Sequence, residues 1–127
     1  MSYLIDTNGW IAFFEDSPQL STQAAELIEA RESCFISVAS IWEAGIKVAL
    51  GKLKLPYDLR NDLPRLIEDN GFQILPVEID DATGVCDLPH HHGDPFDRVM
   101  VVQAMRRNLR VISRDPVFEK YGLRRIW

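Results

Sequence analysis

Acidic side chains stand at four places in the sequence, each at the border of an apolar run. Asp6 ends YLID, Glu43 lies in SVASIWE, and Asp115 follows LRVIS. Asp94 and Asp97 open the stretch DPFDRVMVVQA. Carboxylate oxygens are the ligands that Mg²⁺ and Mn²⁺ prefer, and an ion held by Asp and Glu suits the attack of water on a phosphodiester. These five residues are therefore candidate ligands of a catalytic divalent cation.

Helix capping explains each of these acids when it is considered singly. Ser40 and Glu43 have the spacing of a capping box, Asp94 precedes Pro95 as an N-cap precedes the first helical residue, and Asp115 also precedes a proline. Several carboxylates at one edge would, however, repel one another and raise one another's pKa. Ser, Thr or Asn would cap without that repulsion, so the group as a whole favours a bound cation.

Strands and helices are predicted to alternate along the chain, because short apolar runs alternate with segments of helical periodicity. The predicted strands are 3–6, 34–38, 72–77, 109–113 and 123–127, and the predicted helices are 8–15, 21–33, 40–50, 78–88, 94–108 and a short turn at 115–122. The Pro-punctuated segment 51–64 is predicted to be a loop followed by a short helix. Helical spacing places Trp10, Trp42 and Met105 among the buried residues.

This alternation predicts an α/β fold, in which a five-stranded parallel sheet carries helices on both faces. At 127 residues the chain is expected to form a single domain, residues 1–127. Parallel sheets bind ligands outside the carboxyl ends of their strands. The acidic residues follow or adjoin those ends, so we expect them to converge there.

The net charge of −5 conceals an asymmetry. Residues 1–97 carry 17 acidic and 6 basic side chains, whereas residues 98–127 carry 2 acidic and 8 basic ones. The basic segment is either a surface for a polyanion such as RNA or an ordinary solvated face, and both interpretations stay open. If RNA binding depends on it, the affinity should fall steeply with added salt.

Cysteine content and hydropathy indicate where the protein resides. Cys34 and Cys86 have apolar neighbours and no metal-type spacing, which is typical of thiols in a reducing compartment. The longest uncharged run, Ser33 to Trp42, is far shorter than the roughly 20 residues of a membrane span. We therefore expect a cytoplasmic protein without a membrane partner.

Four segments together resemble the PIN domain family, and most of all the VapC-type ribonuclease toxins of prokaryotic toxin–antitoxin pairs. They are LIDTN, SVASIWEAGIKVALGKLKLP, LPHHHGDPFDRVMVVQAM and VISRDPVFEKYGLRRIW, and the resemblance runs from Tyr3 to Trp127. It implies an endoribonuclease that depends on Mg²⁺ or Mn²⁺ and has RNA as its substrate. The resemblance further implies that the protein binds a cognate antitoxin and forms a homodimer. It also implies the PIN fold, a five-stranded parallel sheet flanked by helices.

The resemblance assigns roles to individual residues. The four family acids fall on Asp6, Glu43, Asp97 and Asp115, which are the implied catalytic and metal-binding residues. Asp94 matches the additional aspartate of a DPFD subgroup and is implied as an auxiliary ligand.

Other polar residues flank the acids. Asn8 occupies a small polar position that supports the first aspartate, and Arg98 and Arg114 adjoin proposed ligands and are candidate contacts to the RNA backbone. Lys47, four residues after Glu43, is either an exposed ion-pair partner on the same helix face or a cation near the cleaved phosphate. The run His90–His92 suggests a zinc site, but adjacent residues of an extended loop point apart and zinc ligands are usually spaced. A loop that lines the mouth of the site is the preferred interpretation.

Two other functions fit parts of the pattern. A non-catalytic RNA- or protein-binding module could use the same scaffold, although none of the proposed ligands has been lost. A phosphatase with Asp6 as nucleophile would commonly carry DxD after the first strand, where this chain has Asp6-Thr7-Asn8.

Overall fold

A computed structural model describes residues 1–30 and 32–127 of the protein. The elements, in chain order, are β1 (Ser2–Ile5), α1 (Thr7–Phe14), α2 (Thr22–Glu29), β2 (Ser33–Ser37), α3 (Val38–Ala49), α4 (Leu59–Asp69), β3 (Gln73–Leu75), α5 (Ile79–Gly84), the 3₁₀ helix η1 (Val85–Asp87), α6 (Pro95–Arg107), β4 (Arg110–Ile112), α7 (Val117–Lys120) and β5 (Arg125–Ile126). Among the described residues, no helix has both the length and the apolar character needed to cross a membrane.

The sheet confirms the predicted fold class. In the part of the chain that the structure describes, five strands pair in the order β3-β2-β1-β4-β5, and every pairing is parallel. The chain builds outward from β1 to β3 on one side and then returns to add β4 and β5 on the other. The strand order therefore reverses beside β1, and the carboxyl ends of β1 and β4 meet at the point where such sheets bind ligands.

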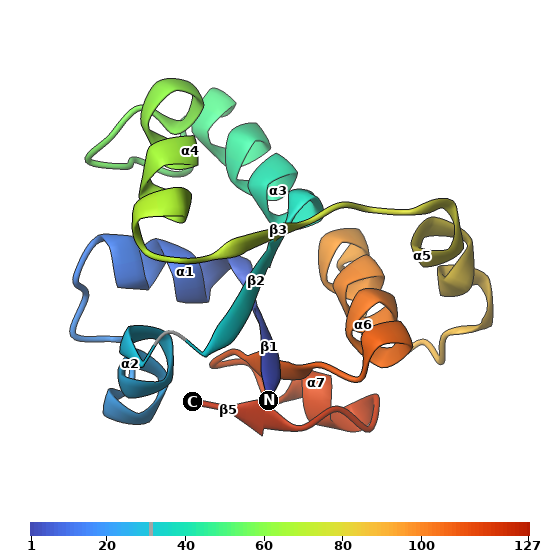
Figure 1. The fold of residues 1–127 in the computed structure, drawn as a ribbon. Coiled ribbons are helices and arrows are strands. Elements are labelled where there is room, and N and C mark those ends of the chain that lie inside the picture. Colours follow the sequence, from blue (N-terminus) through green and yellow to red (C-terminus); the bar gives the residue numbers. More distant parts are fainter. Residues whose placement is uncertain (31) are drawn as a thin grey trace.

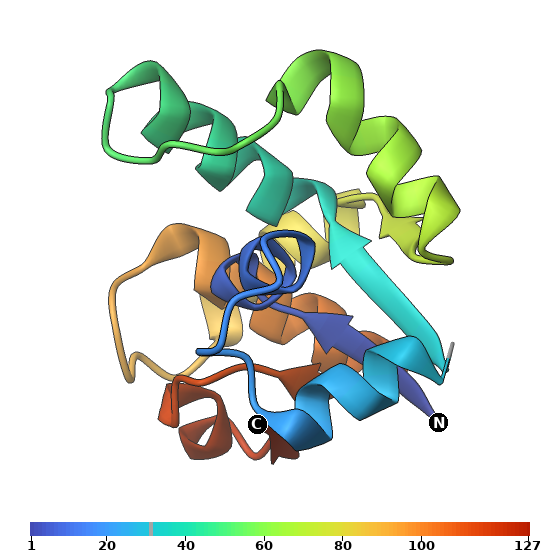
Figure 2. The same ribbon diagram turned by 90° about the vertical axis from the view of Figure 1, so that its left-hand side faces the viewer.

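Apolar side chains of alternate strand residues form a core on each face of the sheet. Tyr3 and Ile5 of β1 contribute to one core with residues of α1, α2, α3 and α4. Leu4 contributes to the other core with residues of α6 and α7. In Figure 1, α1, α2 and α4 accordingly lie on one side of the strands and α6 on the other, and Figure 2 shows the same arrangement from the side. This is the period-two alternation of a sheet that is covered on both faces.

Three details of the sequence prediction are wrong. The helix expected to end near residue 64 continues to Asp69 with Pro64 inside it, because burial of Leu63 and Ile67 outweighs the hydrogen bond that proline removes. Trp42 is 65% exposed, with its ring in edge-to-face contact with Phe96, and Met105 is 52% exposed. Trp10, by contrast, is fully buried as predicted.

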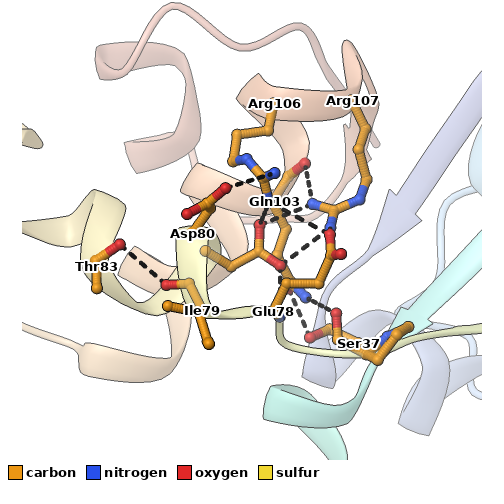
Figure 3. Close-up of polar contacts among 10 residues, drawn as sticks. Ser37, Glu78, Ile79, Asp80, Thr83, Gln103, Arg106 and Arg107 are labelled. Carbon is orange, nitrogen blue, oxygen red and sulfur yellow. Dashed lines mark hydrogen bonds and ion pairs between the residues drawn. The ribbon is translucent and has the colours of Figure 1, made fainter.

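An ionic network ties the short helix α5 to the end of α6. Asp81 is fully buried and accepts hydrogen bonds from Arg106 at 2.6 Å and Arg107 at 2.9 and 3.0 Å. Arg107 also contacts Glu78 at 2.5 Å, and the backbone amide of Glu78 donates to Asp81 at 2.9 Å. Figure 3 shows both arginines reaching from α6 toward the segment that carries Glu78 and Asp80.

The same face of α6 is also anchored to the sheet. Gln103 is fully buried, accepts a hydrogen bond from Ser37 at the end of β2 (2.6 Å), and donates one to the carbonyl of Pro76 (3.1 Å). Close packing contributes as well, because a Cβ at Gly84 would lie 2.6 Å from Cγ1 of Val102. Helix α6 is thus joined to α5 and to β2 by buried polar contacts and by close packing.

The Asp81 network predicts a defined pH dependence of stability. Burial alone would raise the pKa of Asp81, but hydrogen bonds from Arg107, from the Glu78 amide and from Arg106 lower it from 3.8 to about 2. A lowered folded-state pKa stabilises the protein above pH 4, and this contribution is lost as the pH falls toward 2. We expect Asp81→Asn to reduce the free energy of unfolding by about 2 kcal/mol at pH 7, measured by urea titration, and by progressively less below pH 4.

The neighbouring residue supplies the control for this prediction. The side chain of Asp80 is 78% exposed, so Asp80→Asn should change the free energy of unfolding by less than about 0.5 kcal/mol. Equal effects of the two variants would contradict a stabilising role of the buried network.

Candidate active site

The five predicted acids gather at the carboxyl edge of the sheet. Asp6 directly follows β1, Asp115 follows β4, Glu43 lies in α3 after β2, and Asp94 and Asp97 lie at the start of α6. The charges of the other four acids all raise the pKa of Asp97, so the group shares one electrostatic environment. The convergence expected from the sheet order is therefore present.

Asp6 is the most firmly held of the acids. It is the N-cap of α1, and its Oδ1 accepts a hydrogen bond from the Gly9 amide at 2.8 Å while Ser113 Oγ donates to its Oδ2 at 2.6 Å. The Ser113 contact joins the carboxyl ends of β1 and β4 across the point of strand reversal. Burial raises the pKa of Asp6 to about 6, opposed by these two hydrogen bonds and assisted by the charges of Glu43 and Asp115.

Glu43 is held by side chains on two helices. Thr7 Oγ1 of α1 donates to its Oε1 at 2.6 Å, and Lys47 Nζ contacts its Oε2 at 2.7 Å. The predicted capping box with Ser40 is wrong, because α3 begins at Val38 and Ser37 is its N-cap. Freed from capping, the Glu43 carboxylate turns toward α1.

Ser40 and Lys47 have distinct roles along the same helix. Ser40 accepts a hydrogen bond from the Trp10 indole at 3.0 Å and donates one to the carbonyl of Ser37 at 2.9 Å. The hydrogen bond to Glu43 raises the pKa of Lys47 despite partial burial, and the charges of Asp94 and Asp97 raise it further. The predicted ion pair is therefore present, and its ammonium lies within the field of the acidic group.

The two aspartates at the start of α6 have different hydrogen-bonding roles. Asp94 is the N-cap, as predicted, and accepts hydrogen bonds from the amides of Phe96 and Asp97 at 2.9 and 3.1 Å. The Asp97 side chain takes no part in the capping. Burial raises the pKa of Asp97 to about 8, with further contributions from Asp94, Glu43, Asp6 and Asp115. A pKa in this range favours the protonated form of the Asp97 carboxyl group near neutral pH, because burial and the four neighbouring acids outweigh the nearby charge of Lys47.

The histidine loop reaches the same group through one of its three histidines. Nε2 of His92 lies 3.4 Å from Oδ2 of Asp97, and its Nδ1 lies 2.8 Å from the hydroxyl of Tyr121. The ring of His91 packs edge-to-face on Tyr121. Arg98 holds this loop, because its guanidinium donates to the Tyr121 hydroxyl at 3.2 Å and to loop carbonyls including that of Pro89 at 3.1 Å. Its suggested contact with RNA stays a prediction beside this observed role.

The remaining predicted residues lie at the exposed margin of the site. Asp115 is exposed, and its Oδ1 accepts a hydrogen bond from the amide of Val117 at 2.9 Å. Asn8 and Arg114 are exposed as well. Within the basic C-terminal segment, Arg106, Arg107 and Arg125 form ion pairs with acidic residues of the chain itself, and binding of a polyanion by the segment stays a prediction.

Sequence reasoning missed the neutral groups that position the acids. Thr7 and Ser113 each donate to a catalytic candidate, and a Cβ at Gly9 would lie 2.9 Å from Oδ1 of Asp6. Thr7 and Gly9 follow the first acid within three residues, so their proximity in the sequence was a usable signal. Ser113 lies 107 residues from Asp6, and only the β1–β4 pairing reveals that contact.

The carboxylates suit a hard divalent cation in donor type and in charge. In residues 1–30 and 32–127, no three His, Cys, Asp or Glu side chains have the arrangement of a preformed metal site. The raised pKa values of Asp6 and Asp97 nevertheless identify a place where added positive charge would be favourable. Oxygen donors of this kind fit Mg²⁺ or Mn²⁺ better than the softer metals.

Comparisons with known proteins agree with this geometry. The sequence profile of the family described as "PIN domain" matches residues 3–123. No curated protein matches the chain closely enough to count as a relative.

Several solved structures share the fold over nearly the whole chain. VapBC2 from Rickettsia felis, bound to a DNA fragment from its promoter, has 17% sequence identity and a TM-score of 0.71, with 100% of this chain and 99% of that chain covered. FitAcB from Neisseria gonorrhoeae has 20% identity and a TM-score of 0.68, covering 98% and 96%. VapC20 from Mycobacterium tuberculosis, a sarcin–ricin loop cleaving toxin, has 13% identity and a TM-score of 0.71, covering 96% of each chain.

The tight surroundings of Gly9 predict that this position tolerates no side chain. A Cβ there would lie 2.7 Å from Cγ1 of the buried Ile5 as well as 2.9 Å from Asp6. We expect Gly9→Ala to lower the free energy of unfolding by about 1–3 kcal/mol in a urea titration. Gly45→Ala is the matched control, since its Cβ would find only Leu59 at 3.8 Å and should stabilise α3 by about 0.5–1 kcal/mol. A neutral Gly9→Ala variant would contradict the described packing.

The raised pKa of Asp97 predicts that this carboxyl group destabilises the protein as the pH rises. Its pKa is about 8 in the folded state against 3.8 ordinarily, so its contribution to stability is lost between pH 4 and pH 8. In the presence of a chelator, Asp97→Asn should raise the free energy of unfolding at pH 8 by roughly 1–3 kcal/mol and have little effect near pH 4. The exposed Asp87 provides the control variant Asp87→Asn, and a pH-independent effect of Asp97→Asn would contradict the assignment.

Proposed function

The chain belongs to the PIN domain family, and on that premise we propose that it is a metal-dependent endoribonuclease, the toxin of a toxin–antitoxin pair. Residues 1–127 would act as one domain. The observation that carries the proposal is the convergence of Asp6, Glu43 and Asp97 from three separate segments, with the pKa of Asp97 raised to about 8. A fold that needed these residues only as helix caps would gain nothing from placing them together.

Asp6 and Asp97 are the proposed principal holders of a Mg²⁺ or Mn²⁺ ion, with Glu43, Asp94 and Asp115 as the remaining carboxylates of the set. When bound, such an ion supplies the positive charge that activates water for attack on a phosphodiester and neutralises the leaving oxygen. The chain itself fixes the orientation of the carboxylates. Ser113 and Gly9 hold Asp6, Thr7 and Lys47 hold Glu43, and the amides of α6 hold Asp94.

Cations of the chain would bind the RNA backbone around this group. Lys47 is 43% exposed at its side chain while it contacts Glu43, and Arg114 is exposed beside Asp115. Both are thus able to approach a phosphate without leaving the neighbourhood of the acids. The exposed Asn8 would contact the same strand.

Partners are proposed from the structural neighbours. VapBC2 is a complex bound to promoter DNA, and a further neighbour is described as a toxin–antitoxin complex from Klebsiella pneumoniae, with 20% identity and a TM-score of 0.61 over 91% of this chain. We propose by analogy that a cognate antitoxin binds this chain and that the toxin forms a homodimer.

The binding-module and phosphatase alternatives have less support. A non-catalytic module gives no reason for five carboxylates in one electrostatic environment. A phosphatase with Asp6 as nucleophile would commonly carry a second aspartate two residues later, where this chain has Asn8.

The proposal predicts that Asp97→Asn abolishes cleavage while the protein stays folded. With a pool of structured RNA and Mn²⁺, the wild-type protein should release fragments, and the variant should be slower by roughly a hundredfold or more. A chelator should stop the wild-type reaction, and Mn²⁺ should restore it. Asp80→Asn, which alters an exposed acid of α5, should cleave like the wild type. Undiminished cleavage by Asp97→Asn would refute the proposed mechanism.

A further inference from the structure

A hollow of about 270 Å³ lies beside α1. Its walls come from α1, from the connection to α2, from Arg114 in the segment after β4 and from Trp127. Figure 2 shows that the C-terminal end lies beside the connection between α1 and α2. Two of the lining residues adjoin the proposed catalytic acids, because Asn8 follows Asp6 by two positions and Arg114 directly precedes Asp115. The lining of the hollow is therefore adjacent in sequence to two of the proposed catalytic acids.

Four of the polar side chains that line this hollow are not used by the fold, whereas the hydroxyl of Ser17 accepts a hydrogen bond from the Gln19 amide at 3.2 Å. Within the described residues, no hydrogen bond or ion pair engages the side chains of Asn8, Glu15, Gln19 or Arg114, all of which are exposed. This contrasts with the other face of the acidic group, where the side chains of Lys47, Arg98 and His92 all have partners. Donors and acceptors that line a concavity without internal partners are available to a ligand.

The aromatic wall of the hollow narrows the chemistry of that ligand. Trp127 is partly buried and packs against the core that contains Trp10, while it also lines the hollow. A fixed indole beside amide, carboxylate and guanidinium groups suits a flat heteroaromatic ring with a polar edge. Single-stranded RNA presents such rings when its bases are unstacked, and proteins read them by stacking and by hydrogen bonds to the base edge.

The positions of the two charged side chains give the ligand a direction. Arg114 lines the hollow and directly precedes Asp115 in the sequence, so a phosphate of the backbone would lie beside it. Glu15 is the C-cap of α1 and stands one helix length away from Asp6. A carboxylate only accepts hydrogen bonds, so Glu15 excludes a phosphate and favours a base edge that carries N–H donors. Guanine presents two such donors side by side.

We propose that this hollow binds one unpaired nucleobase next to the cleaved bond, with guanine preferred through Glu15. The proposal rests on the proposed ribonuclease function and adds a determinant of its sequence specificity. In this arrangement the base stacks on Trp127, its edge donates to Glu15, and Arg114 contacts the adjoining phosphate. The volume of the hollow is below the roughly 300–1,000 Å³ of sites for drug-sized ligands, which is appropriate for a single base.

Indole fluorescence tests base binding without any cleavage. In the double variant Trp42→Phe, Asp97→Asn, Trp127 is the tryptophan that a ligand can reach, because Trp10 is fully buried. We would titrate it with five-nucleotide uridine oligomers that carry each of the four bases at the central position. Stacking should quench the fluorescence, and the guanine oligomer should bind about tenfold more tightly than the others, as expected of a two-point contact to a base edge.

Glu15→Gln in the same background is the decisive variant, because an amide cannot accept two hydrogen bonds from adjacent N–H donors with equal strength. The preference for guanine should fall below about threefold, while Glu26→Gln, the same change at an exposed residue outside this hollow, should retain it. Unchanged fluorescence with every oligomer would overturn the proposed base site. A guanine preference that survives Glu15→Gln, or a preference for another base, would overturn the role of Glu15.

The outcome separates this proposal from the proposed function. Failure of the ribonuclease assignment appears as absence of metal-dependent cleavage by the wild-type protein, whereas the titration reports on the hollow whether or not cleavage occurs. If the wild-type protein cleaves RNA but Glu15→Gln cleaves with an unaltered base preference beside the cut, the nuclease stands and the base site is refuted.

Discussion

Electrostatic repulsion among buried and half-buried carboxyl groups is the constraint around which this molecule is organised. Asp97 lies where burial and the charges of four other acids raise its pKa to about 8, and the pKa of Asp6 rises to about 6 for the same reasons. Such an arrangement reduces stability on its own. The surrounding structure therefore has to hold the acids together against their mutual repulsion, and a bound cation would reduce that repulsion. This opposition between stability and site chemistry is common at functional sites.

The restraint comes from hydrogen bonds that serve two purposes. Asp6 and Asp94 are both helix N-caps, so the backbone amides at the start of each helix also fix the orientation of a carboxylate. Ser113 joins β4 to Asp6, and Thr7 joins α1 to Glu43. Helix capping and membership of the acidic group were competing interpretations of these residues. Asp6 and Asp94 cap their helices and also belong to the acidic group. For Glu43 and Asp97 the carboxylates are free of capping and face the group.

Helix α6 has to be rigid because it carries two of the acids at its first turn. Its far end is fixed to α5 by Asp81, Arg106 and Arg107, and its middle is fixed to β2 by Gln103. At its start, Arg98 binds the carbonyls of the preceding loop, which places His92 beside Asp97. Groups far from the acids thereby determine where Asp97 lies, and three basic residues of the C-terminal segment, Arg98, Arg106 and Arg107, contribute to the fold.

Sequence alone determined the fold class, the strands and nearly all the helices, because apolar periodicity reflects burial on one or both faces. It also located the acids at the strand ends, since the direction of a parallel sheet follows from its order of elements. The sequence prediction failed where contacts between distant segments determine the structure. Trp42 lies in an apolar helix stripe that the rest of the described chain does not fully cover, and α4 continues past Pro64 because its apolar face is buried. Glu43 caps no helix, because α3 begins earlier than its sequence indicated. The contacts of Ser113, His92 and Tyr121 depend on residues that are distant in sequence, so only the tertiary structure could reveal them.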